Sequence, residues 1–224
     1  MTTLTQTSTY SGRFTWTIHD EVIRLRQWAT DTVYELPKVS EDRSSECTVG
    51  AGRGCQIQLD DRWASRHHAL LSYEEGFWNV ADLDSRNGVK IDGVRLRKAR
   101  LEPGMEVRIG RTTLVAESLR SIGLRCYLGR ILGWSERQRE TVDAAMGRVR
   151  QAHRERAPIV LRGEEELVAV AQELHGHVFG ANAPFVMCDP YRHTGRASAR
   201  APANVEEATA ALIAAQGGNV VPSQ

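Results

Sequence analysis

The chain has 224 residues, of which 41% are hydrophobic and 25% are charged, and its formal net charge is +1 at pH 7. This is the composition of an ordinary globular protein of one or two domains that can bury a hydrophobic core. A net charge so close to zero provides no global field for non-specific binding to nucleic acid, so only a local basic patch could serve that purpose.

The cysteines and the N-terminus indicate the compartment. Four cysteines, Cys47, Cys55, Cys126 and Cys188, form no C-x-x-C pair and are too scattered for a disulfide framework, so we interpret them as reduced thiols. The N-terminus lacks the basic start and apolar centre of a signal peptide, and no run approaches the roughly 18 apolar residues of a membrane span. A cytoplasmic protein with no membrane partner is therefore predicted.

The first half of the chain has the pattern of a β-sandwich. Residues 1–11 are rich in Ser and Thr, almost without apolar side chains, and are predicted to be a disordered tail. Residues 12–118 then show period-two alternation with turn signals about every ten residues, which predicts an antiparallel β-sandwich. The expected strands are 22–28, 33–36, 47–49, 57–59, 69–73, 78–81, 89–91, 107–109 and 113–115.

The second half has apolar residues at helical spacing, which predicts a multidomain β plus α/β fold. Residues 119–134 are expected to link the two halves, and 135–224 are expected to form an α/β region. The apolar spacing predicts helices over 136–156, from 167 to 178 and around 205–216. Short apolar runs at 159–161 and 185–187 are expected to be strands.

A set of polar and glycine residues falls in the gaps between the expected strands. In order along the chain these residues are Gly50, Ser65, Arg66, His68, Asn87 and Gly88. Their order and spacing resemble those of the forkhead-associated (FHA) domain, over about residues 14–118. That family is a β-sandwich that binds phosphothreonine peptides, so the resemblance implies the same fold and ligand class here.

Three of these residues have the chemistry to contact a phosphopeptide. The Ser65 hydroxyl and the Arg66 guanidinium can give charge-assisted hydrogen bonds to phosphate oxygens. The resemblance implies that Asn87 donates to and accepts from the peptide backbone beside the phosphothreonine.

The other three are expected to shape the loops: Gly50, His68 and Gly88. Glycine suits tight turns because it has no Cβ. The resemblance implies that His68 is a buried brace, with direct contact to the ligand as the alternative.

The sequence departs from the family pattern at two positions. Ala51 replaces the arginine that normally follows the first glycine, and Arg86 replaces the threonine before Asn87. Losing a phosphate-facing arginine costs about 1.5–3 kcal/mol. We expect Arg53 and Arg86 to compensate for that loss. Alternatively both are solvated surface residues, or Ala51 marks a domain that has exchanged phosphate for another ligand.

The stretch after residue 156 resembles the start of the AAA+ domain of bacterial sigma-54-dependent activators. The run 159–161, Gly163, the segment 166–169 and the segment 184–186 carry this resemblance, and 210–218 resembles the approach to the acidic Walker B strand. The phosphate-binding loop G-x-x-x-x-G-K-[ST] is missing, and three glutamates follow Gly163 where an anion would bind. We therefore predict a degenerate domain without ATPase activity and without a cofactor.

Other candidate chemistry has little support. His175, His177, Cys188 and His193 fit no zinc spacing, so no metal site is predicted. No motif supports a nucleophilic triad, so the chain is not expected to be an enzyme. Arginines alternate with acidic residues along 136–156, which is typical of a solvated, ion-paired helix face and not of direct nucleic-acid contact.

The predicted function is phosphothreonine-dependent protein binding by a signalling adaptor in bacterial Ser/Thr kinase signalling. The expected partner is a phosphothreonine-containing protein, either a kinase or its substrate. The alternative is a transcription regulator related to sigma-54-dependent activators, for which RNA polymerase would be a partner. A nucleotide-dependent enzyme is a third class, which the missing lysine disfavours.

Overall fold

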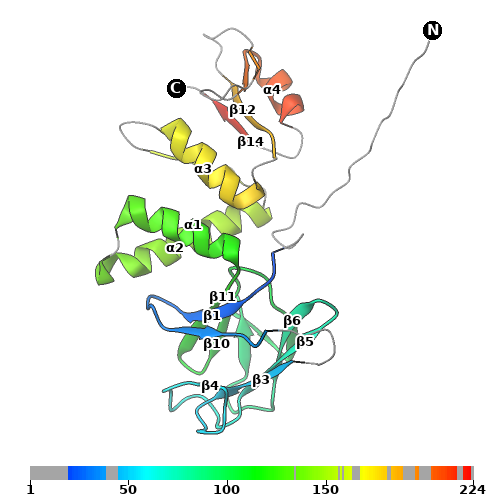
Figure 1. The fold of residues 1–224 in the computed structure, drawn as a ribbon, viewed down its shortest axis with the longest axis vertical. Coiled ribbons are helices and arrows are strands. Elements are labelled where there is room, and N and C mark those ends of the chain that lie inside the picture. Colours follow the sequence, from blue (N-terminus) through cyan, green and yellow to red (C-terminus); the bar gives the residue numbers. More distant parts are fainter. Residues whose placement is uncertain are drawn as a thin grey trace, which may run out of the picture.

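The structure is a computed structural model that describes residues 20–38, 45–133, 135–155, 157, 159–162, 167–180, 183–188, 195–196, 203–215 and 219–222. The tail expected at residues 1–11, the glutamate run after Gly163 and His193 lie outside the described residues. Figure 1 shows a β-sandwich at one end of the molecule, helices in the middle and a small α/β unit at the other end.

The predicted antiparallel sandwich is confirmed and consists of two sheets. One has the strand order β2-β1-β11-β10-β7-β8, with β1 Arg24–Gln27, β2 Val33–Glu35, β7 Val89–Ile91, β8 Val94–Leu96, β10 Glu106–Ile109 and β11 Thr112–Glu117. The other has the order β4-β3-β5-β6-β9, with β3 Glu46–Gly50, β4 Ile57–Gln58, β5 Ala69–Glu74, β6 Phe77–Asp82 and β9 Lys98–Arg100. All pairs in the two sheets are antiparallel except the short pair of β3 with β4.

The core of the sandwich follows from period-two alternation. Leu25, Val107 and Leu114 point inward from the first sheet and are fully buried, and Leu71 is buried on the second sheet. Trp78 is only 2% exposed and provides the largest side chain of this core. Each fully buried aliphatic side chain contributes about 1.5–3 kcal/mol. The sandwich is therefore a stable platform for the loops at its ends.

Two short edge strands, β8 and β9, were not predicted from the sequence. They are three residues each and have no fully buried side chain, so period-two burial leaves almost no trace in them. The predicted turn before β8 is present, because Asp92 and Gly93 both have positive φ, at 48° and 83°. That conformation matches the tight turns which favour Asp-Gly in hairpins.

Residues 119–134, predicted to be a linker, instead contain helix α1, Leu119–Leu132. The helix begins at a capping box in which the Ser118 hydroxyl accepts from the Ser121 amide (3.1 Å) and the Ser121 hydroxyl accepts from the Ser118 amide (2.8 Å). Leu124 and Leu128 pack against the next helices. Glycines within and after this segment weaken its helical pattern, which is why the sequence did not reveal it.

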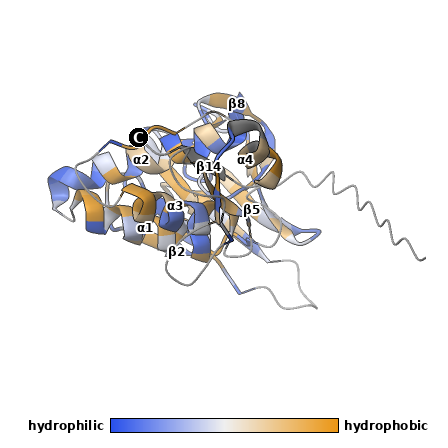
Figure 2. Ribbon diagram, turned by 90° about the horizontal axis from the view of Figure 1, so that it is seen from above, coloured by the Kyte–Doolittle hydropathy of each residue, from blue (hydrophilic) through white to orange (hydrophobic). Residues whose placement is uncertain are grey.

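Helices α2, Glu136–Glu155, and α3, Leu167–Phe179, lie where the sequence predicts them. Figure 2 shows hydrophilic and hydrophobic residues alternating along α1 and α2, as expected for helices that cover one face of a core. Within the described part of the chain, no helix is both long enough and apolar enough to cross a membrane.

Buried ion pairs attach α2 to the outer face of the six-stranded sheet. Arg26, which is 2% exposed, contacts Asp143 through two hydrogen bonds of 2.6 and 3.0 Å and Glu117 at 2.6 Å. Arg150 contacts Asp92, in the turn after β7, at 2.6 and 2.9 Å. Removing one partner from such a pair leaves a buried charge uncompensated, so these contacts fix where the helix lies.

The C-terminal unit contains a parallel sheet in the order β13-β12-β14, with β12 Phe185–Cys188, β13 Ala203–Val205 and β14 Asn219–Pro222. The strand predicted at 185–187 is thus confirmed. Helix α4, Ala208–Ala214, packs on this sheet through Ala211 and is shorter than predicted, because Val205 belongs to a strand. The prediction of a buried strand at 159–161 was wrong: the run is not a strand, and Ile159 and Val160 are 49% and 73% exposed.

Candidate functional site

Three loops meet at one end of the sandwich. They connect β3 to β4, β4 to β5 and β6 to β7, and they carry all the predicted site residues except Gly50, which is the last residue of β3. The first loop is bonded to the second through the amides of Ala51 and Gly52, which donate to the carbonyls of Ser65 and Arg66, both at 2.9 Å. The third is bonded to the second through the Arg86 amide, which donates to the Ser65 hydroxyl oxygen at 3.1 Å. Segments far apart in sequence are thus held in one place.

His68 lies at the centre of this arrangement and is 0% exposed. Its Nδ1 accepts from the Ser65 amide at 2.9 Å, and its Nε2–H donates to the Gly88 carbonyl at 3.1 Å. Nε2 also lies 2.9 Å from the hydroxyl oxygen of Ser85, which donates to Asp82 and accepts from the Gly88 amide. One buried ring therefore joins the second loop to the third.

Gly50 and Gly88 occupy positions that other residues would disturb. A Cβ on Gly50 would collide with the carbonyl oxygen of Arg66, so the first loop can approach the second only because that Cβ is absent. Gly88 has φ = 72°, in the left-handed region that favours glycine. Both glycines therefore permit the loops to pack as they do.

Ser65 and Asn87 retain hydrogen-bonding capacity for a ligand. The Ser65 hydroxyl accepts from Arg86, so its own proton remains to be donated. The Asn87 side-chain amide donates to the Trp63 carbonyl at 2.7 Å, while its Oδ1 bonds to none of the described residues. Asn87 is exposed and Ser65 is half-buried, so both can be reached from solvent.

The same three loops carry three arginines, Arg53, Arg66 and Arg86, which are all exposed. Among the described residues, no carboxylate pairs with any of them. Ala51 packs against the sandwich core. Arg53, Arg66 and Arg86 therefore contribute unpaired positive charge to these loops.

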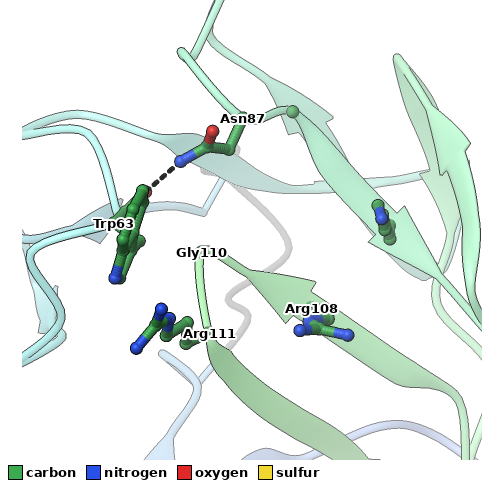
Figure 3. Close-up of a pocket in the computed structure, with 7 residues that line it drawn as sticks. Trp63, Asn87, Arg108, Gly110 and Arg111 are labelled. Atoms are coloured by element: carbon green, nitrogen blue, oxygen red, sulfur yellow. Dashed lines mark hydrogen bonds between the residues drawn. The ribbon is translucent and has the colours of Figure 1, made fainter.

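A pocket of about 250 Å³ adjoins the third loop and shares Asn87 and Gly88 with it. Its other lining residues, which were not predicted from the sequence, are Trp63, Lys90, Arg108, Gly110 and Arg111. Figure 3 shows Trp63 and Arg111 on one side of this pocket and Arg108 on strand β10. In the sequence, only the outward-facing cations Lys90 on β7 and Arg108 on β10 could have indicated this pocket. The pairing that brings these two strands together cannot be read from the sequence.

Asp61 fixes the side of this pocket that Trp63 and Arg111 form. Its carboxylate accepts from the amides of Trp63 (2.8 Å), Arg111 (2.6 Å) and Thr112 (3.0 Å). Burial acts to raise the pKa of Asp61, but these hydrogen bonds outweigh it and lower the pKa below its ordinary value. The carboxylate thus remains charged at neutral pH.

Of the residues considered as metal ligands, the structure describes His175, His177 and Cys188. Among the described residues, no cluster of three or more His, Cys, Asp or Glu side chains could hold a metal ion. His175 is buried, with Nε2 bonded to the Ala183 carbonyl at 3.1 Å and its ring stacked on Phe179. Burial lowers the pKa of His175, which suits a neutral, packed ring.

Comparisons with known proteins identify the sandwich. Residues 47–110 match the family described as FHA domain. The FHA domain-containing protein FhaB of Mycobacterium tuberculosis is 37% identical over 67 residues, which are 30% of this chain and 43% of that protein. FhaB of Mycolicibacterium smegmatis gives the same values. This chain therefore spans less than half the length of the curated relatives it matches.

Part of this chain is also similar to solved structures. Mycobacterium tuberculosis EmbR, solved in complex with a low affinity phosphopeptide, is 26% identical with a TM-score of 0.38, over 42% of this chain and 24% of that one. The FHA domain of a Chlamydia trachomatis protein is 23% identical with a TM-score of 0.37, over 42% of this chain and 94% of that one. The family match and the FhaB relatives therefore show that residues 47–110 of this chain are similar to the FHA domain family.

Proposed function

We propose that the sandwich binds a protein partner through a phosphothreonine. The observation that carries this proposal is the arrangement around Ser65. Its hydroxyl proton is free to donate, and His68 fixes its loop. The three loops here carry Arg53, Arg66 and Arg86, which are exposed and have no ion-pair partner among the described residues. Donors held on rigid loops bind an anion well because little conformational entropy is lost on binding. This arrangement occurs within the segment that matches the FHA domain.

Each group has a distinct part in the proposed complex. The Ser65 hydroxyl and the Arg66 guanidinium donate to phosphate oxygens. Arg53 and Arg86 supply the charge that the family places at the position of Ala51, since both lie on loops that bond to the Ser65–Arg66 segment. The free Oδ1 of Asn87 accepts an amide of the extended peptide, while the bond to Trp63 orients the side chain.

Calorimetric titration with three forms of one peptide tests the proposal: phosphothreonine, phosphoserine and unmodified threonine. Only the phosphothreonine form is expected to bind tightly. Ser65→Ala and Arg66→Ala should each weaken binding about tenfold or more, the scale of a hydrogen bond to a charged group. Exposed His67 and Arg148 provide matched controls, and replacing either with Ala should leave the affinity unchanged.

The same titration separates the two arginines that could replace the missing one. Arg53→Ala and Arg86→Ala are each compared with the Arg148→Ala control. A tenfold loss in one variant alone assigns the compensating role to that residue, and a similar loss in both assigns it to the pair. Unchanged affinity in both would remove them from the site. Equal affinity for the phosphorylated and unmodified peptides would overturn the proposed function itself.

The partner follows from the same chemistry. A phosphothreonine arises when a Ser/Thr kinase modifies a protein, so the proposed partner is such a kinase or its substrate in a bacterial cytoplasm. The sandwich itself needs only to bind, and catalysis has no part in the proposal. The protein would then act as an adaptor that brings a phosphorylated partner to whatever the second half contacts.

The second half of the chain supports the alternative, a transcription regulator, less well. The run 159–161 would be the strand leading to a phosphate-binding loop, but it is not a strand, and Ile159 and Val160 are exposed. The parallel sheet β13-β12-β14 under α4 is compatible with a degenerate nucleotide-binding domain. We infer that this half neither binds nor hydrolyses ATP. A rise in melting temperature with ATP and magnesium would contradict that inference, and co-purification with RNA polymerase would favour the alternative.

A further inference from the structure

The β7–β8 hairpin connects the proposed binding loop to the helices. Strand β7 begins directly after Gly88, and the Asp92–Gly93 turn follows its other end. Strand β8 then runs back along β7, and its Arg95 guanidinium lies so close to Gly88 that a Cβ there would collide with it. At about 3.3 Å per residue, the chain from Gly88 to Asp92 spans about 13 Å. One short element therefore contacts both the binding loop and the side of the sheet that faces α2.

This hairpin has little stability of its own. Strand β8 lies at the edge of the sheet with all its side chains exposed, and β7 pairs with β10 through only three residues. Strand pairing places Lys90 directly opposite both Arg95 and Arg108, and all three are exposed. Like charges directly opposite in a sheet are destabilising, and short edge hairpins are marginally stable. The position of the hairpin therefore depends on what holds its two ends.

Arg150 on α2 holds the end that is far from the binding loop. Its guanidinium donates to the Asp92 carboxylate at 2.6 and 2.9 Å and to the Gly104 carbonyl at 2.8 Å. The Asp92 carboxylate also accepts from the Glu106 amide at 3.0 Å. The side chains of Arg150 and Asp92 are only 14% and 23% exposed, so water and salt screen this pair little. Arg150 thereby joins the hairpin turn to the turn that precedes β10.

The near end of the hairpin is held at Gly88. The Gly88 carbonyl accepts from His68 at 3.1 Å, and the Gly88 amide donates to the Ser85 hydroxyl at 2.9 Å. Asn87, which is proposed to bind the peptide backbone, directly precedes Gly88 in the chain. A peptide bound at Asn87 therefore stabilises the near end of the hairpin whose far end Arg150 holds. Two contacts that stabilise one element against local opening are thermodynamically coupled.

We propose that Arg150 is a positioning residue for phosphopeptide recognition, which acts through Asp92 and the β7–β8 hairpin on Asn87 and Gly88. The proposal rests on the proposed function and adds a requirement for helix α2 to it. Asp92 lies within the segment that matches the FHA domain, residues 47–110, and Arg150 lies outside it. Figure 1 shows α2 at the opposite end of the sandwich from β3 and β4. Displacing α2 from the sheet would therefore weaken phosphopeptide binding from a distance.

Variants at Arg150 test this role in the full chain. Arg150→Gln removes the charge and the bidentate contact, whereas Arg150→Lys keeps the charge and can keep one hydrogen bond to Asp92. Arg148→Gln is the matched control, because Arg148 is exposed on the same helix. Affinity for a phosphothreonine peptide is measured by fluorescence anisotropy at a temperature where melting curves show that each variant is folded. Amide hydrogen exchange is measured with and without saturating peptide.

Arg150→Gln should bind the peptide about fivefold more weakly than the wild type, the lower end of the usual range for coupled sites. Arg150→Lys should lose less affinity, and Arg148→Gln should lose none. Without peptide, Arg150→Gln should exchange the amides of β7 and β8 faster than the control does. By reciprocity, the peptide should slow exchange of the Asp92 amide, which donates to the Glu106 carbonyl at 2.9 Å.

Three outcomes would overturn the positioning role and leave the proposed function intact. The first is a lower Tm for Arg150→Gln with unchanged phosphopeptide affinity, which would make the contact purely structural. The second is an equal loss of affinity in Arg150→Gln and Arg148→Gln. The third is peptide binding that leaves exchange of the Asp92 amide unchanged, since the hairpin would then carry no coupling.

Two further cases complete the test. If Arg150→Gln does not fold, Arg150→Lys is compared with Arg148→Gln in its place, and equal affinity of these two variants would overturn the role of Arg150. A wild type that binds no phosphothreonine peptide would overturn the proposed function, and the role of Arg150 in recognition with it.

Discussion

Replacing His68 with Ala should damage both the stability of the sandwich and its binding loops. The ring is fully buried and makes contacts of 2.9, 3.1 and 2.9 Å with the Ser65 amide, the Gly88 carbonyl and the Ser85 hydroxyl. Alanine leaves these groups without that partner, at about 1–3 kcal/mol for each one that stays buried, and it also opens a cavity. Because Ser65 is half-buried and water can reach it, we expect a total loss of about 3–4 kcal/mol.

Thermal and urea unfolding of His68→Ala and of His67→Ala measure this effect. His67 is the adjacent exposed histidine and serves as the matched control. At 2–4 °C per kcal/mol for a chain of this size, His68→Ala should lower Tm by about 6–16 °C, and His67→Ala should leave it unchanged. The affinity of His68→Ala for a phosphothreonine peptide should also fall at a temperature where the variant is folded.

Equal Tm values for the two histidine variants would refute this reasoning, since they would mean that the buried contacts of His68 contribute nothing net. A lower Tm with unchanged phosphopeptide affinity would refute only the link between the ring and the loops. In that case His68 would be a core residue whose position near Ser65 has no consequence for binding.

Three further perturbations test other parts of the structure. Asp143→Ala leaves the buried Arg26 guanidinium without its bidentate partner and should lower the free energy of unfolding in urea by about 3–5 kcal/mol. A loss below about 1 kcal/mol would mean that this pair does not fix α2. Gly50→Ala should weaken phosphopeptide binding and lower Tm, because the new Cβ would collide with the Arg66 carbonyl. Gly54→Ala should do neither, because there is open space around a Cβ at that position. Similar behaviour of the two variants would contradict the close approach of the loops. Burial acts to raise the pKa of Asp92, but hydrogen bonds from Arg150 and the Glu106 amide outweigh burial and lower this pKa. The Asp92 carboxylate therefore stabilises the fold above the pKa it has in the unfolded chain. This stabilisation is lost as the pH falls through the pKa of Asp92 in the folded chain. Asp92→Asn should therefore be about 1–2 kcal/mol less stable than the wild type at pH 7 and equal to it in strong acid, and a difference independent of pH would contradict the assignment.

Most of the sandwich could be predicted because burial on one face of a strand leaves period-two alternation in the sequence. The strands around Leu71 and Val107 show this pattern clearly. Strands β8 and β9 do not, because their side chains stay largely exposed. Helix α1 was missed since its helical pattern is diluted by glycine, and its capping residues, Ser118 and Ser121, were not recognised as a helix start.

In the second half, a strand was predicted from the sequence that the structure does not contain. A run of three apolar residues at 159–161 was predicted to be a strand on local character alone, but a strand needs a partner, and this run has none among the described residues. Short apolar runs do not distinguish a buried strand from an exposed connection. The run 185–187 became a strand because β13 and β14 pair with it on either side.

The candidate site could be predicted only where its residues are close in sequence. Ser65 and Arg66 share one loop, and Asn87 follows in another, so a family pattern can find them. The pocket beside Asn87 depends on Lys90 and Arg108 being cross-strand neighbours, which is a property of strand pairing. Sequence spacing carries no record of that pairing, so those cations became visible only in the fold.

Amide NMR titration of the full chain with matched phosphothreonine and unmodified peptides tests the central proposal most directly. The phosphorylated peptide should shift the amides of Gly52, Ser65, Arg66, Arg86 and Asn87, and the unmodified peptide should shift none of them. Amides of α2 and α4, which lie away from these loops, should stay in place (Figure 1). Equal shifts with both peptides, or shifts confined to residues outside the three loops, would contradict phosphothreonine recognition at this end of the sandwich.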